Sequence, residues 1–238
     1  RPCPLLHSIY ICWMPSLIGT IICAKKLTLK TMGSNAESTN SHVHDGQETQ
    51  LSPLWRRKMK TFFDTIDKKG NGVIRKSDFC RLLTRINQNI PFIVLYRQIS
   101  AFTKAFEHIV LNIFWAEMAT RGGDIGDSRT VDFDEFTHNI CMNLKQENVQ
   151  VFKEVLDYIA VCFFKLIAVN RDQEISVDEY ILFLGLFGVH EEFPINWFES
   201  IDTNCNGSIG LIELRSAFFD FWLGQNVGPG TYLLGRLL

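Results

Sequence analysis

The stretch I-D-T-N-C-N-G-S-I-G-L-I-E-L, which runs from Ile201 to Leu214, decides the fold class of this chain. Side chains that carry oxygen alternate through its first half, and a glutamate follows after a glycine turn. Apolar residues recur at three- and four-residue spacing on both sides, as they do on one face of a helix. The pattern predicts two helices joined by a loop whose oxygen atoms converge on a cation. The apolar residues are Trp197, Phe198 and Ile201 before the loop and Leu214, Phe218 and Phe219 after it.

Residues 202–213 match the spacing of an EF-hand calcium loop. Such a loop surrounds Ca²⁺ with oxygens from positions 1, 3, 5, 7, 9 and 12, with glycine at position 6 for the sharp turn. Gly207 occupies the turn position, and Gly210 at position 9 leaves that place to a water molecule. An Asn- and Gly-rich turn without metal would not require agreement at so many positions. The predicted ligands, at positions 1, 3, 5, 7 and 12, are Asp202, Asn204, Asn206, Ser208 and Glu213.

Three earlier polar breaks, near residues 72, 128 and 172, interrupt helical patterns in the same way. They predict an all-α fold of four EF-hand helix-loop-helix units in two pairs, with short strand pairing between the loops of each pair. At position 8 of the last loop, Ile209 is expected to face Ile175. The four loops, named one to four, are Asp67–Asp78, Asp124–Glu135, Ala168–Glu179 and Asp202–Glu213.

Loop one keeps the frame of a calcium loop and loses ligands. Lys69 stands at position 3 and has no oxygen to offer, and Arg75 stands at position 9, so two cations oppose a divalent metal. We predict a structural role, with the shorter Asp78 at position 12 leaving at most a weak site better suited to Mg²⁺ than to Ca²⁺. Positions 1, 5, 6 and 8 match the pattern through Asp67, Asn71, Gly72 and Ile74.

Loops two and three also depart from the pattern. Loop two has Asp124 at position 1, but Gly126 removes the ligand at position 3 and Arg129 replaces the turn glycine, which predicts weak binding at most. In loop three, Ala168 replaces the first carboxylate and Gln173 the glycine. We predict that loop three binds no metal and supplies a strand to loop four.

Two loop segments and the tail resemble a known family. FFDTIDKKGNGVIRKSDF, IDTNCNGSIGLIEL and the closing GPGTYLLGRLL are similar to segments of invertebrate sarcoplasmic calcium-binding proteins, which are related to calexcitins and coelenterazine-binding proteins. The resemblance covers roughly residues 54–238 and implies a compact, all-helical intracellular protein that binds Ca²⁺ and Mg²⁺, usually at up to three loops. With one complete loop here, it implies a modest cytoplasmic calcium buffer or sensor.

The chain is expected to divide into three parts. Residues 1–50 read as a disordered leader, in which the apolar run from Cys3 to Ala24 is a membrane anchor only if it belongs to the native protein, and Met32 is a candidate start of translation. Residues 54–148 form the N-terminal pair with degenerate loops. Residues 149–238 form the C-terminal pair with loop four and a packed tail.

Composition argues against several functions. A formal charge of −2 with scattered positive residues excludes the basic footprint of a nucleic-acid binder. The six histidines form no HExxH or similar pattern, so we expect no enzyme. Seven cysteines without a CxxC pair favour a reducing compartment, with Cys80, Cys141 and Cys162 expected as buried free thiols.

A second function remains open because the chain is rich in aromatic residues. It contains 19 Phe, five Trp and five Tyr, which indicate a core of packed aromatic rings that could also line a pocket. The alternative is therefore a carrier of an apolar, coelenterazine-like small molecule on an EF-hand scaffold. Ordinary core packing explains stacks such as Phe102, Phe106, Phe114 and Trp115 without a cavity.

Overall fold

The structure is a computed structural model that describes residues 51–89, 115, 129–144, 149–168, 173–190 and 194–237. The predicted leader, residues 1–50, lies outside the described residues. So do Asp124 and Gly126 of loop two, and Phe102, Phe106 and Phe114 of the predicted aromatic stack. Residues 50–238 belong to one unit of contacts, and the predicted division near residue 148 stays a prediction.

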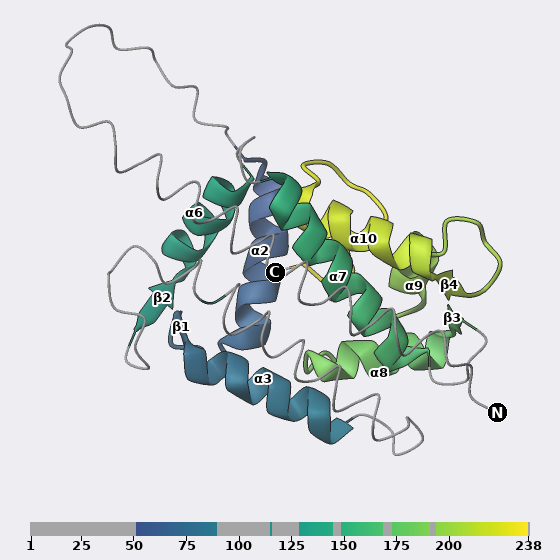
Figure 1. The fold of residues 1–238 in the computed structure, drawn as a ribbon, viewed down its shortest axis with the longest axis horizontal. Coiled ribbons are helices and arrows are strands. Elements are labelled where there is room, and N and C mark those ends of the chain that lie inside the picture. Colours follow the sequence, from purple (N-terminus) through teal and green to yellow (C-terminus); the bar gives the residue numbers. More distant parts are fainter. Residues whose placement is uncertain are drawn as a thin grey trace, which may run out of the picture. The chain divides into compact units, whose positions relative to one another are not determined.

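The described chain is mostly helical, with four short strands between helices (Figure 1). This confirms the predicted class, a helical fold with small strand pairs. The helices are α2 (Pro53–Ile66), α3 (Lys76–Asn89), α6 (Phe133–Asn143), α7 (Val149–Ile167), α8 (Val177–Leu186), α9 (Ile195–Ile201) and α10 (Leu211–Leu223). The strands are β1 (Val73–Arg75), β2 (Thr130–Asp132), β3 (Glu174–Ile175) and β4 (Ile209–Gly210).

The strands pair the loops two by two. β1 runs antiparallel to β2, with Ile74 opposite Val131, and β3 runs antiparallel to β4, with Ile175 opposite Ile209. All four side chains are at most 1% exposed, so position 8 of each loop is part of the core. The predicted contact between Ile175 and Ile209 is confirmed.

The carboxylate at position 12 caps the helix that leaves the loop. In three loops its oxygen accepts a hydrogen bond from the backbone N–H of position 9, three residues earlier, which is one half of a capping box. In α8 the other half is present, because the hydroxyl of Ser176 accepts from the backbone N–H of Glu179. The three bonds to the carboxylate join Arg75 to Asp78 (2.8 Å), Ser176 to Glu179 (2.9 Å) and Gly210 to Glu213 (2.9 Å).

Aromatic rings on α2 join it to helices from other units. The ring of Phe62 lies 6.0 Å from that of Phe136 on α6 and 4.8 Å from that of Trp222 on α10. The indole N–H of Trp55 donates to the backbone carbonyl of Trp222 at 2.8 Å inside the core. Helix faces predicted from spacing are buried as expected, namely Phe62, Phe63 and Ile66 on α2 and Phe79, Leu82, Leu83 and Ile86 on α3.

The C-terminal tail packs against α8 and α10. The hydroxyl of Tyr180 donates to the backbone carbonyl of Leu233 at 3.2 Å, and the side chains of Leu233 and Leu234 are buried. At Gly230 a Cβ atom would lie 1.9 Å from the carbonyl oxygen of Ala217, so glycine is required for the tail to approach α10 this closely.

The cysteines only partly follow the prediction. Cys162 is buried, and burial raises the pKa of its thiol to about 12. Cys141 is half-buried, and the prediction for Cys80 is wrong, because that side chain is exposed. Cys80 follows Phe79 directly, and one step along a helix turns a side chain by about 100° away from the buried face. Within the described residues, no helix combines the length and apolarity needed to span a membrane.

Candidate metal centre

Loop four begins where α9 ends. The backbone N–H of Asp202 donates to the carbonyl of Phe198 at 2.9 Å, and the chain then turns through two residues with positive φ. These are Cys205 at position 4 (φ 57°) and Gly207 at position 6 (φ 83°). Position 6 therefore needs glycine for the reason the sequence pattern implies, whereas Cys205 adopts the left-handed region against the preference of its side chain.

The three side chains at positions 1, 3 and 5 face the inside of the turn. The buried carboxylate of Asp202 accepts from the backbone N–H of Asn206 at 3.1 Å and from that of Gly207 at 2.8 Å. The amide oxygen of Asn204 accepts from the N–H of Asn206 at 2.9 Å, and that of Asn206 accepts from the N–H of Ser208 at 3.0 Å. The loop's own N–H groups thus hold its oxygen atoms in place.

Glu213 closes the loop from the start of α10. Besides the bond from the N–H of Gly210, its buried carboxylate accepts from the N–H of Asn204 and from the hydroxyl of Thr203, both at 3.1 Å. The structure therefore brings the side chain at position 12 back to positions 2 and 3. A ligand that completes the coordination sphere must lie in such a place. The pattern search missed Thr203, because position 2 is not a ligand position.

The donor set suits a hard cation. It consists of two carboxylates, two amide oxygens and, at position 7, the backbone carbonyl of Ser208, without sulfur or imidazole nitrogen, and oxygen donors of this kind favour Ca²⁺ or Mg²⁺ over zinc. Across the described residues, no group of three or more His, Cys, Asp or Glu side chains is placed to hold a metal. Because loop four has only two acidic side chains, a bound Ca²⁺ would also need the amide oxygens of its two asparagines to reach its usual number of ligands. The residues present fit the ion.

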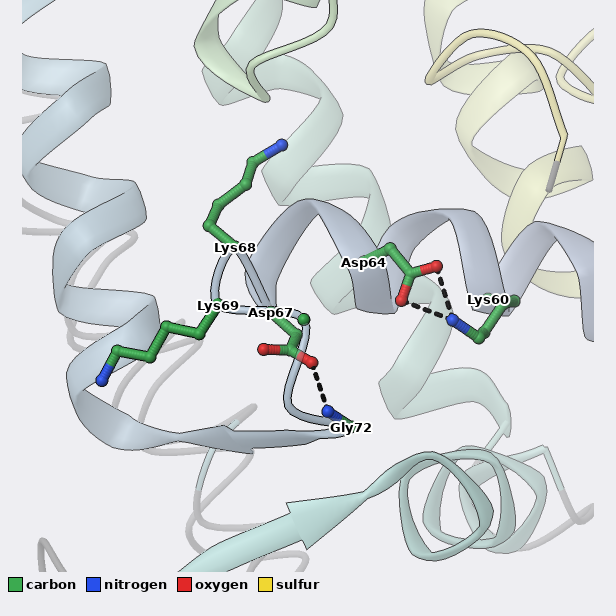
Figure 2. Close-up of a pocket in the computed structure, with 7 residues that line it drawn as sticks. Lys60, Asp64, Asp67, Lys68, Lys69 and Gly72 are labelled. Atoms are coloured by element: carbon green, nitrogen blue, oxygen red, sulfur yellow. Dashed lines mark hydrogen bonds and ion pairs between the residues drawn. The ribbon is translucent and has the colours of Figure 1, made fainter.

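Loop one repeats the backbone of loop four. The carboxylate of Asp67 accepts from the N–H of Asn71 at 3.3 Å and from that of Gly72 at 2.7 Å, and Figure 2 shows the second of these bonds. Gly70 and Gly72, at positions 4 and 6, have φ angles of 63° and 76°. The loop therefore folds as a calcium loop does, although its ligand set is incomplete.

Cations surround loop one. Lys69 at position 3 is exposed, and Figure 2 shows its ammonium extending away from the carboxylate of Asp67. Asp78 at position 12 forms an ion pair with Arg81. Partial desolvation lowers the pKa of Lys68, and nearby Arg85 lowers it further while Asp64 opposes both effects. Lys68 and Lys69 also border an open hollow of about 500 Å³, whose lining is Lys60, Asp64, Asp67, Lys68, Lys69, Gly70 and Gly72.

Loop two supplies its own cation. The guanidinium of Arg129, at position 6, forms an ion pair with Glu135, at position 12. A positive side chain thus neutralises the carboxylate that would otherwise close a metal shell. Asp132, at position 9, accepts from the N–H of Glu135 at 2.8 Å and starts α6.

Loop three contributes a strand and a contact to loop four. Ala168 directly follows α7, and Gln173 takes a positive φ of 67° where loops one and four have glycine. The carboxylate of Glu174, at position 7, lies 2.6 Å from the hydroxyl of Ser208. The register of β3 and β4, which sets Glu174 opposite Gly210, brings this side chain close to loop four, but the register alone does not determine which atom it contacts.

Comparisons with known proteins agree with this geometry. No family model matches the chain. Calerythrin from Saccharopolyspora erythraea is 26% identical over 168 residues, which cover 71% of this chain and 92% of calerythrin. A sarcoplasmic calcium-binding protein from Perinereis vancaurica tetradentata is 26% identical over 189 residues, 79% of this chain and all of the relative. The chain is thus similar in sequence to calerythrin and to a sarcoplasmic calcium-binding protein.

Solved structures share the fold of this chain. The okadaic acid binding protein 2.1 matches with a TM-score of 0.60 and 18% identity, covering 79% of this chain and 98% of that one. The coelenterazine-binding protein from Renilla muelleri, in its calcium-loaded apo form, matches with a TM-score of 0.55 and 20% identity, covering 79% and 100%. At these identities the likeness shows the EF-hand fold, and the ligands in those names belong to those proteins.

Proposed function

We propose that this protein binds Ca²⁺ and that loop four is its tight site, with one ion per chain. The observation that carries the proposal is the inward arrangement of oxygens from Asp202, Asn204, Asn206 and Glu213 around one turn. Similarity to calerythrin and to sarcoplasmic calcium-binding proteins supports the same ion. In this proposal Ca²⁺ is a bound ion that takes part in no reaction, and side chains of this chain bind it.

The proposed role is that of a modest buffer or a sensor in the cytoplasm. One tight site in a chain of 27.4 kDa stores little calcium. The thiols of Cys80, Cys162 and Cys205 are free, in keeping with a reducing compartment. A sensor would change its packing on binding, and Trp222, which contacts Phe62 on α2, is positioned to report such a change by fluorescence.

Calorimetric titration with Ca²⁺, with and without Mg²⁺, tests the proposal. One tight calcium site per chain is expected, with any Mg²⁺ effect arising at a weaker site such as loop one. The absence of calcium binding, or two or more tight sites of equal affinity, would overturn the assignment of loop four as the single tight site.

A carrier of an apolar small molecule is the second candidate, because one cavity is lined entirely by apolar side chains. Its volume is about 50 Å³, whereas pockets that hold drug-sized ligands measure about 300–1,000 Å³. A carried ligand would therefore require its walls to move apart. Native mass spectrometry of the purified protein tests this, since a bound molecule of a few hundred daltons would favour the carrier. The walls are Phe62, Phe79, Leu82, Phe152, Val155, Leu156, Ile159, Phe163, Phe187, Phe218, Phe221, Trp222, Leu233 and Leu234.

A further inference from the structure

A carboxylate from loop three reaches the ligands of loop four. Glu174 on β3 is exposed, and its Oε2 lies 2.6 Å from the Oγ of Ser208. The antiparallel pairing that places Glu174 opposite Gly210 holds the two loops in this register. The buried pair Ile175 and Ile209 anchors it from the core side. The contact therefore follows from the strand pairing.

The hydroxyl of Ser208 also meets a predicted metal ligand. Its Oγ lies 2.9 Å from the Oδ1 of Asn206, and the backbone N–H of Ser208 already donates to the same oxygen at 3.0 Å. An amide oxygen has two lone pairs, and a serine hydroxyl has one hydrogen to donate. If that hydrogen pointed at Asn206, both lone pairs of Oδ1 would be engaged and none would face a cation.

We propose that Glu174 is a positioning residue for calcium binding in loop four. Its carboxylate accepts the hydroxyl hydrogen of Ser208 and so keeps one lone pair of Asn206 Oδ1 open to the ion. A charged acceptor competes well for this hydrogen, because hydrogen bonds to ionised groups are roughly twice as strong as neutral ones. The inference rests on the proposed calcium site and adds a residue from a loop that contributes no ligand to it.

The N-terminal pair lacks this arrangement. Position 7 of loop one is Val73, which has no hydroxyl, and it faces Asp132 across the sheet. Asn71, which corresponds to Asn206, accepts at 3.3 Å from the N–H of Val73. The contacts of Glu174 with Ser208 and of Ser208 with Asn206 thus occur at loop four, where the ligand set is complete.

Calorimetric Ca²⁺ titration of the full chain tests the proposal with two single variants. Residues that orient metal ligands change affinity by about 10- to 100-fold when lost. We expect Glu174→Gln to weaken binding about tenfold, at the low end because the contact is exposed. Glu174→Asp keeps the charge but shortens the reach, so it should weaken binding similarly. Wild-type affinity in either variant would overturn the proposal.

A double variant separates the hydroxyl from simple charge attraction. The variant Glu174→Gln/Ser208→Ala lacks the hydroxyl hydrogen that could occupy a lone pair of Asn206 Oδ1. Its calcium affinity should therefore be higher than that of Glu174→Gln alone. A double variant as weak as the single one would show a through-space charge effect and overturn the positioning role. As a matched control, Glu154→Gln removes a partly exposed charge on α7 and should leave the affinity within about twofold.

Failure of the proposed function would look different. If loop four were not the calcium site, Glu213→Gln would leave the wild-type titration unchanged. If loop four is the site and Glu174 is irrelevant, Glu213→Gln abolishes binding while all Glu174 variants titrate as wild type does.

Discussion

Loop one and loop four are held by the same hydrogen bonds from backbone N–H groups to the first aspartate, yet they offer a cation very different surroundings. In each, the aspartate at position 1 accepts from the N–H groups of positions 5 and 6, at 3.3 and 2.7 Å from Asp67 and at 3.1 and 2.8 Å from Asp202. The comparison separates two roles of the motif. The first aspartate and the turn glycine fold the loop, whereas positions 3 and 12 determine whether a metal has enough ligands.

Position 12 shows how the two roles overlap. Glu213 and Asp78 each lie in the first turn of a helix and accept from the N–H of the residue just before it, so a carboxylate there is useful without metal. Glu213 also reaches the N–H of Asn204, while Asp78 is one methylene shorter and is paired with Arg81. A degenerate loop can therefore keep its acid for capping after its ligand role is lost.

The largest expected effect is at Glu213. Glu213→Gln should abolish tight calcium binding, with a loss of more than the roughly 10- to 100-fold that follows removal of a residue supporting a ligand. The change removes one of only two acidic ligands in loop four and the bidentate closure of the shell. The measurement is the number of sites by calorimetry.

The matched control for Glu213 is the corresponding residue of loop three. Glu179→Gln removes the same charge at position 12 and also weakens a helix cap. It should leave the calcium stoichiometry at the wild-type value. Unchanged stoichiometry in Glu213→Gln would falsify the assignment of loop four.

The second prediction concerns the strand that loop three lends to loop four. Ile175→Ser removes a buried aliphatic side chain that is 1% exposed, at a cost of about 2 to 4 kcal/mol in the free energy of unfolding. Part of this loss should appear as weaker calcium binding, because the metal stabilises the folded pair. Melting temperature with calcium and calcium affinity should fall together.

Ile74→Ser is the control for Ile175→Ser, because Ile74 occupies the same position in the N-terminal pair and is 0% exposed. It should lower the melting temperature similarly with and without calcium and change the affinity less. Equal affinity losses in both variants would mean that global stability, rather than pairing with loop three, sets the affinity of loop four.

The frame of the fold was predictable because it depends on local spacing. Apolar residues at position 8 and on the helix faces must be buried for the chain to fold, so Ile209 could be paired with Ile175 from sequence. The side-chain pairs that adjust each loop were not predictable in this way. The ion pair of Arg129 with Glu135 requires the actual path of the loop, and the contact of Glu174 with Ser208 requires the conformations of both side chains as well as the strand register.

The third prediction concerns position 3 of loop one. Lys69→Asp should add a weak calcium site with a Kd on the order of 10⁻⁴ M, at the weak end of EF-hand affinities, because the backbone is already in place and an oxygen replaces a cation. Adding Asp78→Glu should strengthen it. Titration that counts sites is the measurement.

Lys68→Asp gives the matched charge reversal for the change at Lys69. Its side chain stands at position 2, which is not a ligand position, and Figure 2 shows it directed away from Asp67. It should add no site. If Lys69→Asp adds none either, Arg75 or the ion pair of Asp78 with Arg81 is the remaining obstacle in loop one.

The smallest expected effect is at position 4, where loop four has Cys205 (φ 57°) and loop one has Gly70 (φ 63°). A residue with a side chain pays about 1–2 kcal/mol in the left-handed region, while glycine loses about 0.5–1 kcal/mol more in conformational entropy on folding. Cys205→Gly should therefore stabilise the folded loop by about 0.5 kcal/mol and raise calcium affinity by about twofold. The reverse change, Gly70→Cys, should lower the melting temperature of the calcium-free protein by a comparable free energy. If Cys205→Gly instead weakens binding, the rigidity that the cysteine gives to loop four contributes more to calcium affinity than the strain it imposes.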